Sequence, residues 1–271
     1  LLLWFVHKLL IRFGITQRLD DALSKYSKAI IYIVRYTTGI LLIINAARGL
    51  LFAPNVPVST HEFAPVLSVL MAAAGILLII GIKIRWAATA ILVAYLLALA
   101  FVRPIIDVAD HLEYVGIGLY LLFYGYKPLE AYAKRKGLQN ILTPESLLRI
   151  FVGLGLMVLA LSEKLVGVGL STDFLHHHHW NFLQVIGVSD RVFIIISGIT
   201  EFVVGLTLVL NIAPRLTTAI VALLMTITAI LLGIEEVFGH LFALSLVAVV
   251  WLRREQPEKP ARKRTGARKR K

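Results

Sequence analysis

Long apolar stretches dominate this sequence and constrain its fold more than any other feature. They lie at 30–52, 64–82, 86–102, 110–126, 147–169, 191–211, 216–233 and 237–252, with short polar breaks between them. A helix that crosses a bilayer needs roughly 20 mostly apolar residues. Hydrophobic residues make up 58% of the chain and charged residues only 16%. The sequence therefore predicts an all-α, polytopic membrane protein of about eight transmembrane helices.

The charged residues indicate how these helices are oriented. Assigning alternate loops to alternate sides places Arg48, Arg103, Lys164 and Arg191 on or near one face, and the other lysines and arginines on the opposite face. Seven of the eight histidines, and most acidic residues, fall toward the first of these faces. The positive-inside rule then predicts a multi-pass protein of the cell (plasma) membrane with both termini in the cytoplasm.

The two ends of the chain differ from the apolar stretches. Residues 1–28 begin with an apolar run that His7, Lys8 and Arg12 interrupt, which favours an interfacial amphipathic helix. Residues 253–271 contain two prolines and no apolar run, which predicts a disordered basic tail. We expect this tail to lie against anionic lipid headgroups. Binding of the tail to an acidic protein or RNA is the alternative. The net charge of +12 points to membrane topology rather than to nucleic acid, because the charged residues are sorted by their position along the chain.

The sequence also contains an internal repeat. Three pairs of segments match: 75–85 with 205–215, Arg35 and Gly39 with Arg149 and Gly153, and 110–112 with 239–241. We expect a first four-helix repeat at 29–127, a cytoplasmic linker at 128–146 and a second four-helix repeat at 147–252. Because four is an even number, both repeats enter the membrane from the same side and are parallel rather than inverted.

Charged residues inside the apolar stretches make the second repeat the candidate for chemistry. Glu163 and Lys164 lie in the outer part of its first helix, and Glu201 lies near the middle of its second helix. The first repeat has Met71 where the second has Glu201. Because charges at this depth are costly unless paired or in a wet cavity, we expect Lys164 to reach Glu201. The alternative is a buried ion pair that only fixes helix packing.

The second repeat resembles the DoxX family of membrane proteins, which includes the DoxD-type subunit of thiosulfate:quinone oxidoreductase. The resemblance rests on Arg149, Gly153, Glu163, Lys164, Leu165, Phe182, Leu183, Ile186, Gly187, Glu201, Gly205, Leu208, Arg215 and 225–229. It covers 147–252 well and 30–126 loosely, since the first repeat lacks the glutamate and the lysine. The resemblance implies a four-helix membrane unit linked to sulfur or quinone redox chemistry, often as one subunit of a larger complex.

A quinone would fit the charged residues of the second repeat. We expect Glu201 and Lys164 to bind the ring oxygens and His240 to handle protons, because imidazole exchanges protons near neutral pH. Glu163, Glu235 and Glu236 would complete the site; the alternative for His240 is a helix cap. The chain has no cysteine, and no haem pair or flavin motif is visible. Electrons would therefore come from another membrane or redox subunit.

Four consecutive histidines, His176, His177, His178 and His179, lie between the first two helices of the second repeat. If this segment is helical, the first and last share a face and could bind copper, zinc or iron with Glu163 or His240 nearby. A solvated loop without metal is the alternative.

Three functions follow from these patterns. The leading hypothesis is a subunit of a quinone-linked oxidoreductase, with sulfur-compound oxidation as its context. The alternatives are a non-catalytic scaffold or assembly subunit, and a metal or small-solute carrier that uses the histidines.

Overall fold

The computed structural model describes residues 2–52, 56–57, 62–102, 104–139, 141–232, 238 and 241–253. This part of the chain is mostly helical, as predicted. Four helices are long and apolar enough to cross a membrane: Ile15–Ala47, Ile84–Phe101, Pro144–Val166 and Asp190–Val209. Shorter apolar helices cover Pro65–Ile80, Glu113–Phe123, Pro214–Ile230 and Leu241–Leu252. These helices belong to a membrane protein.

The helices follow one another along the chain with short connections. In order they are α1 (Leu2–Arg12), α2 (Ile15–Leu23), the 3₁₀-helix η1 (Ser24–Ala29), α3 (Ile30–Ala47), α4 (Ala64–Ile80), α5 (Ile84–Phe101), α6 (Ile106–Ala109), α7 (Glu113–Phe123), α8 (Lys127–Lys136), α9 (Pro144–Leu159), the π-helix η3 (Ala160–Val166), α10 (Val168–His178), the 3₁₀-helix η4 (Phe182–Ile186), α11 (Asp190–Val209), α12 (Pro214–Leu232) and α14 (Leu241–Leu252). Strands β1 (Leu50–Phe52) and β2 (Val56–Pro57) form an antiparallel pair between α3 and α4.

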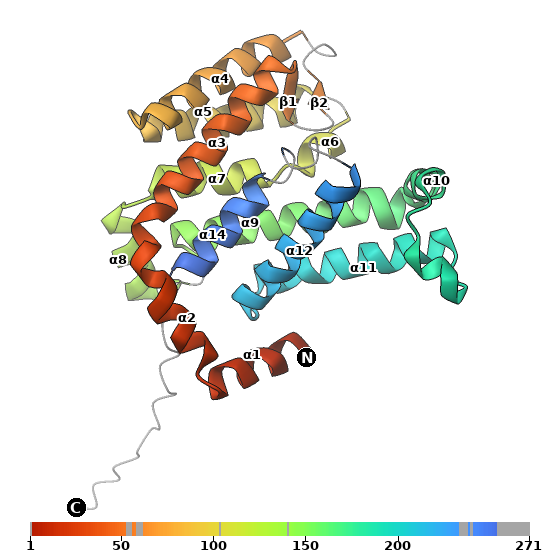
Figure 1. Cartoon of the computed structure of the whole chain (residues 1–271). Helices are drawn as coiled ribbons and strands as arrows, with labels where there is room; N and C mark the ends of the chain where they lie inside the picture. The colour runs from red at the N-terminus through yellow and green to blue at the C-terminus, as the bar shows by residue number, and fades with distance from the viewer. Residues whose placement is uncertain are drawn as a thin grey trace, which may run out of the picture.

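The packing of these helices follows the same order in each half of the chain. Helix α3 packs on α4, α4 on α5 and α5 on α7, and likewise α9 packs on α11, α11 on α12 and α12 on α14. The halves meet where α7 lies on α9 and α14 lies on α3, as Figure 1 shows. The last helix of each half therefore packs on the first helix of the other half.

Glycines allow the closest of these contacts. A Cβ added at Gly39 would lie 2.8 Å from the carbonyl oxygen of Gly75, and one added at Gly153 would lie 2.7 Å from that of Gly205. The backbones of α3 and α4, and of α9 and α11, thus touch without a side chain between them. We refer to these contacts as the glycine pairs.

An arginine near the start of each half caps the helix that carries the partner glycine. Arg35 donates to the carbonyl oxygens of Leu78 and Ile79 at 3.0 and 3.3 Å, and Arg149 donates to those of Leu208 and Val209, the latter at 3.0 Å. The last carbonyls of a helix have no partner within it. A guanidinium satisfies them and complements the negative end of the helix dipole.

The bundle has two chemically different ends. Helix α8, which carries Lys134, Arg135 and Lys136, lies at one end, and α10 with its histidines lies at the opposite end (Figure 1). We call these the basic end and the acidic end, since Asp190 begins α11 beside α10.

Some boundaries differ from the sequence prediction. The helix expected over 30–52 ends at Ala47, because Gly49 adopts a left-handed φ of 68° and the chain continues as β1. Residues 2–29 contain α1, α2 and η1 rather than one helix, with a break at Gly14, whose φ is 67°. The helix expected over 110–126 covers Glu113–Phe123. The predicted basic tail lies outside the described residues from position 254 onward.

Candidate functional site

One face of α11 is built to approach the neighbouring helix closely. Gly198, Glu201 and Gly205 are spaced by three and four residues, so they share that face. A Cβ added at Gly198 would lie 2.8 Å from the Cβ of Lys164 on η3. Gly205 meets Gly153 one turn beyond Glu201. The glutamate is therefore held between two points of close contact and faces the helix that carries Lys164.

Lys164 and Glu201 form an ion pair, as the sequence predicts. The ammonium Nζ lies 2.5 Å from the carboxylate Oε2. The Glu201 side chain is 10% exposed and that of Lys164 is 24% exposed. An ionised donor and acceptor at this separation make a strong hydrogen bond. The lysine still reaches the surface of the bundle, so the pair is accessible from outside.

Much of the surface beside this pair is apolar. Leu161 and Val166 on η3, and Ile199 and Val203 on α11, all have exposed side chains. In a membrane protein, exposed apolar side chains of this kind face lipid. The partly exposed Lys164 thus lies beside surface that suits contact with lipid.

The lysine lies in a π-helix, which changes the direction of neighbouring side chains. Helix α9 continues into η3, whose seven residues include Glu163 and Lys164. π-Helical turns are rare and are frequent at functional sites. Lys164 is directed toward α11, while the charge of Glu163 acts on His111 in the other half. Two consecutive residues thus act on different polar groups.

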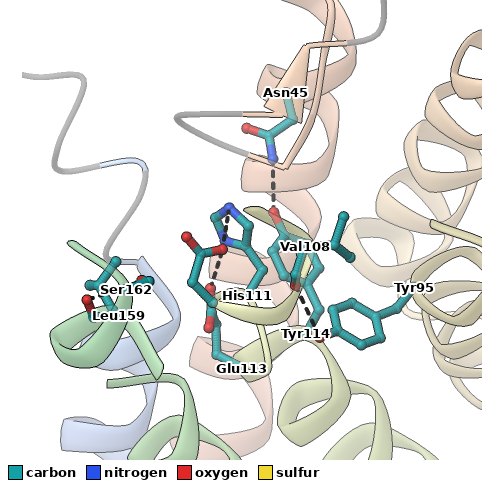
Figure 2. Close-up of polar contacts among 9 residues, drawn as sticks. Asn45, Tyr95, Val108, His111, Glu113, Tyr114, Leu159 and Ser162 are labelled. Carbon is teal, nitrogen blue, oxygen red and sulfur yellow. Dashed lines mark hydrogen bonds and ion pairs between the residues drawn. The ribbon is translucent and has the colours of Figure 1, made fainter. Parts of the chain in front are cut away.

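The second polar cluster lies at the acidic end, between α6 and α7. Figure 2 shows His111 next to Glu113, with Nδ1 3.1 Å from Oε1 of the carboxylate. The other ring nitrogen, Nε2, lies 3.6 Å from Oδ1 of Asp110. His111 is only 6% exposed, and the aromatic ring of Phe52 from β1 covers it at a centroid distance of 5.5 Å. We call Asp110, His111 and Glu113 the imidazole cluster.

Neighbouring helices hold the imidazole cluster in place. Asn45 on α3 donates from Nδ2 to the hydroxyl of Tyr114 at 2.9 Å, and Tyr95 on α5 donates to the carbonyl of Val108 at 3.0 Å (Figure 2). Gly155 on α9 lets the cluster approach, since a Cβ there would lie 3.0 Å from Oε2 of Glu113. Helices from both halves therefore surround it.

The surroundings of His111 favour its protonated form. Burial alone lowers the pKa of an imidazole, because it penalises the charged form. The hydrogen bond that the ring donates to the Glu113 carboxylate, and the negative charges of Glu113, Asp110 and Glu163, outweigh burial and raise the pKa of His111 above its ordinary value. The neighbouring carboxylates thus shift the equilibrium toward the protonated imidazole.

The four consecutive histidines lie at the end of α10 and are exposed. His176 contacts the Asp190 carboxylate at 2.9 Å, and its ring centroid lies 6.2 Å from that of His179. His178 stacks on Trp180 at 4.6 Å. Within the described ranges no three histidine or acidic side chains are arranged to hold a metal ion. Metal binding by His177 and its neighbours stays a prediction.

Some predicted site residues lie outside the described part of the chain. These are Glu235, Glu236 and His240. The contacts of His111 with Glu113 and of Asn45 with Tyr114 were not predicted from the sequence. The matching of 110–112 with 239–241 was the available signal, because it singled out both histidines.

The comparisons with known proteins found no relative. No protein-family model, no curated protein and no solved structure matches this chain.

Proposed function

We propose that this chain is the membrane subunit of a quinone-linked oxidoreductase, with the Lys164–Glu201 pair as the site for the quinone headgroup. The observation that carries the proposal is the ion pair itself: it joins two ionised groups among apolar, lipid-facing side chains, and the lysine remains partly exposed. Ionisable residues inside a membrane are costly and usually functional. The resemblance of 147–252 to DoxX proteins points to the same chemistry.

The two side chains suit a quinone chemically. A quinone headgroup presents carbonyl oxygens, which need hydrogen-bond donors, and the Lys164 ammonium carries three N–H donors. The reduced form presents hydroxyl groups, for which the Glu201 carboxylate is an acceptor and a base. When bound, a quinone would supply two-electron, two-proton redox chemistry. Lys164 would orient the ring, and Glu201 would take or return a proton at a ring oxygen.

The whole subunit would work together with a redox partner. Electrons would pass through a separate redox subunit, because the sequence has no cysteine and no haem or flavin motif. The equivalent glycine pairs and arginine caps support an internal duplication of two four-helix repeats. The sorting of charge between the two ends supports eight spans with both termini in the cytoplasm at the plasma membrane.

Binding of a short-chain quinone tests the proposal. We expect the full-length protein in nanodiscs to bind decylubiquinone one to one, as measured by titration and native mass spectrometry. Glu201→Gln and Lys164→Met should each weaken binding at least about tenfold, the value of one charge-assisted hydrogen bond. Glu62→Gln changes an exposed carboxylate and serves as the control. A wild-type protein that carries partner subunits but binds no quinone would overturn the proposal and favour a scaffold.

A further inference from the structure

The short 3₁₀-helix η4, between α10 and α11, presents apolar side chains to its surroundings rather than to the bundle. Phe182, Val185 and Ile186 are 70%, 88% and 72% exposed. Val185 is the most exposed large apolar side chain in the described part of the chain. A contiguous apolar patch of this kind marks a surface that contacts a membrane or another molecule. We call these three side chains the η4 patch.

Polar contacts fix η4 in this orientation. Asn181 is buried, and its side chain accepts a hydrogen bond from the backbone N–H of Leu183 at 3.1 Å. Its Nδ2 donates to the carbonyl oxygen of Val188 and to Oδ1 of Asp190, both at 2.8 Å. Gly187 ends η4 with a left-handed φ of 84°, which turns the chain toward α11. The fold itself therefore directs the η4 patch outward.

The η4 patch continues onto the surface of α11. The ring of Phe182 packs edge-to-face on that of Phe193, with the centroids 5.1 Å apart. Val192 and Ile196, which lie on either side of Phe193 along α11, are exposed. Helix α11 is long and apolar enough to cross a membrane, and exposed apolar side chains on such a helix face lipid. Lipid that contacts this part of α11 therefore also reaches η4.

Polar and aromatic side chains beside η4 indicate that it lies at the boundary of the apolar region. Asp190 begins α11, and His176 on α10 contacts its carboxylate at 2.9 Å. In Figure 1, α10 is seen nearly end-on while α9 and α11 run across the view, so α10 lies across the end of the bundle. Trp180 follows α10 and stacks on His178. Tryptophan is enriched where the acyl chains of a bilayer meet its headgroups.

We propose that η4 inserts into the leaflet at the acidic end, with Phe182, Val185 and Ile186 among the acyl chains of phospholipids. The four exposed histidines of α10 lie at the level of the headgroups, where imidazole N–H groups can donate to phosphate oxygens. Lipid is favoured over a protein as the occupant because the η4 patch is continuous with the lipid-facing surface of α11. The inserted segment is the same whether or not the Lys164–Glu201 pair binds a quinone.

A nitroxide on a single cysteine tests the insertion, because the native chain has no cysteine. The full-length Val185→Cys variant is labelled and reconstituted in phosphatidylcholine nanodiscs. Ile196→Cys on α11 and His177→Cys on α10 are the matched lipid-facing and water-facing controls. Oxygen concentrates among acyl chains, whereas the nickel complex Ni-EDDA stays in water. We expect power-saturation EPR to show that the labels at positions 185 and 196 collide mainly with oxygen, and the label at 177 mainly with Ni-EDDA.

The two collision partners separate lipid from water and from protein. Collision with Ni-EDDA as frequent at position 185 as at 177 would place η4 in water and overturn the insertion. A label at 185 that neither reagent reaches would show that protein covers the η4 patch, which also overturns it; dipolar broadening would then identify a second copy of this chain.

Thiol reactivity provides a second measurement on the same variants. Val185→Cys in nanodiscs should react with a membrane-impermeant maleimide at least about tenfold more slowly than His177→Cys, because only the thiolate reacts and apolar surroundings disfavour it. Denaturation in SDS should make the two rates equal. Equal rates before denaturation would contradict the insertion.

Discussion

Two opposing contributions to the free energy of folding act at the Lys164–Glu201 pair. Each ion is expensive to bury, and their attraction offsets that cost only while both are present. Lys164 is partly exposed, so its share of this cost is smaller than for a fully buried charge. The pair therefore contributes little net stability, while the loss of one partner leaves an uncompensated charge among apolar side chains.

Changing one partner should destabilise the protein more than changing both. We expect Glu201→Gln to lower the free energy of unfolding by about 1–3 kcal/mol, less than the ~3–5 kcal/mol for a fully buried pair because Lys164 is partly exposed. Adding Lys164→Met should recover most of the loss. A double-mutant cycle in detergent measures the coupling. Single variants as stable as wild type would contradict an ion pair that compensates buried charge.

His111 makes stability depend on pH in a defined direction. Because its pKa is raised in the folded state, its contribution is fully present below the unfolded value of about 6.5 and is lost as pH rises through the folded pKa. We expect the unfolding free energy of wild type, relative to His111→Gln, to fall from pH 6.5 upward, by at most about 1.4 kcal/mol per pH unit. Thermal unfolding between pH 6 and 9 measures this. An opposite slope would mean that burial, and not Glu113, dominates.

At the scale of elements, helix contacts without intervening side chains determine which faces meet. The glycine pairs bring α3 onto α4 and α9 onto α11, and Gly198 brings η3 onto α11. Because protein interiors are close-packed, even one added methyl group at such a contact disturbs the packing of the two helices. The direction in which Glu201 projects is thus fixed by the glycines one turn on either side.

Adding a methyl group to a glycine pair should separate the helices. Gly153→Ala places a Cβ 2.7 Å from the Gly205 carbonyl oxygen, and we expect a loss of about 1–3 kcal/mol in unfolding free energy. Gly39→Ala should behave alike in the first half. Gly169→Ala on α10 meets nothing within 4 Å and should be neutral or slightly stabilising. Equal stabilities of Gly153→Ala and Gly169→Ala would refute the close contact.

The sequence predicts the helices well and their irregularities poorly. Hydropathy placed helices over 86–102 and 191–211, where the structure has Ile84–Phe101 and Asp190–Val209. It did not detect η3, because an apolar stretch of this length is compatible with α- and π-helical turns alike. It extended the first helix through Leu50–Phe52, since an apolar strand of three residues resembles the end of an apolar helix.

The candidate site was predictable only where charge interrupts an apolar stretch. Lys164 and Glu201 stand out for that reason, and the structure joins them. The influence of Glu163 on His111 could not be predicted, because the two residues belong to different halves of the chain, and the packing of α7 on α9 brings these halves together there.

At the scale of the whole molecule, charge distinguishes the two ends of the bundle. The basic residues of α8 lie at one end, and the imidazole cluster and the histidines of α10 lie toward the other. The basic end also holds Arg215, which binds Asp20 on α2 and the carbonyl of Arg253 after α14. The N-terminal helices are therefore attached to the bundle on that side.

Labelling of single cysteines should place the two ends on opposite sides of the membrane. The native chain has no cysteine, so Lys136→Cys and His177→Cys each introduce a single thiol. We expect a membrane-impermeant maleimide to label His177→Cys in intact cells and Lys136→Cys only in inverted vesicles, because basic segments stay in the cytoplasm. Labelling of both from the same side would exclude the proposed orientation.

The glycine pairs also determine how this molecule could open. Next to them the arginine caps tie α3 to α4 and α9 to α11 near the basic end, and the backbones there cannot move closer. Each pair therefore fixes the distance between its two helices at one end. Widening between η3 and α11 would come from separation of the helices at their other end. That end carries Lys164 and Glu201, so the ion pair opposes this opening.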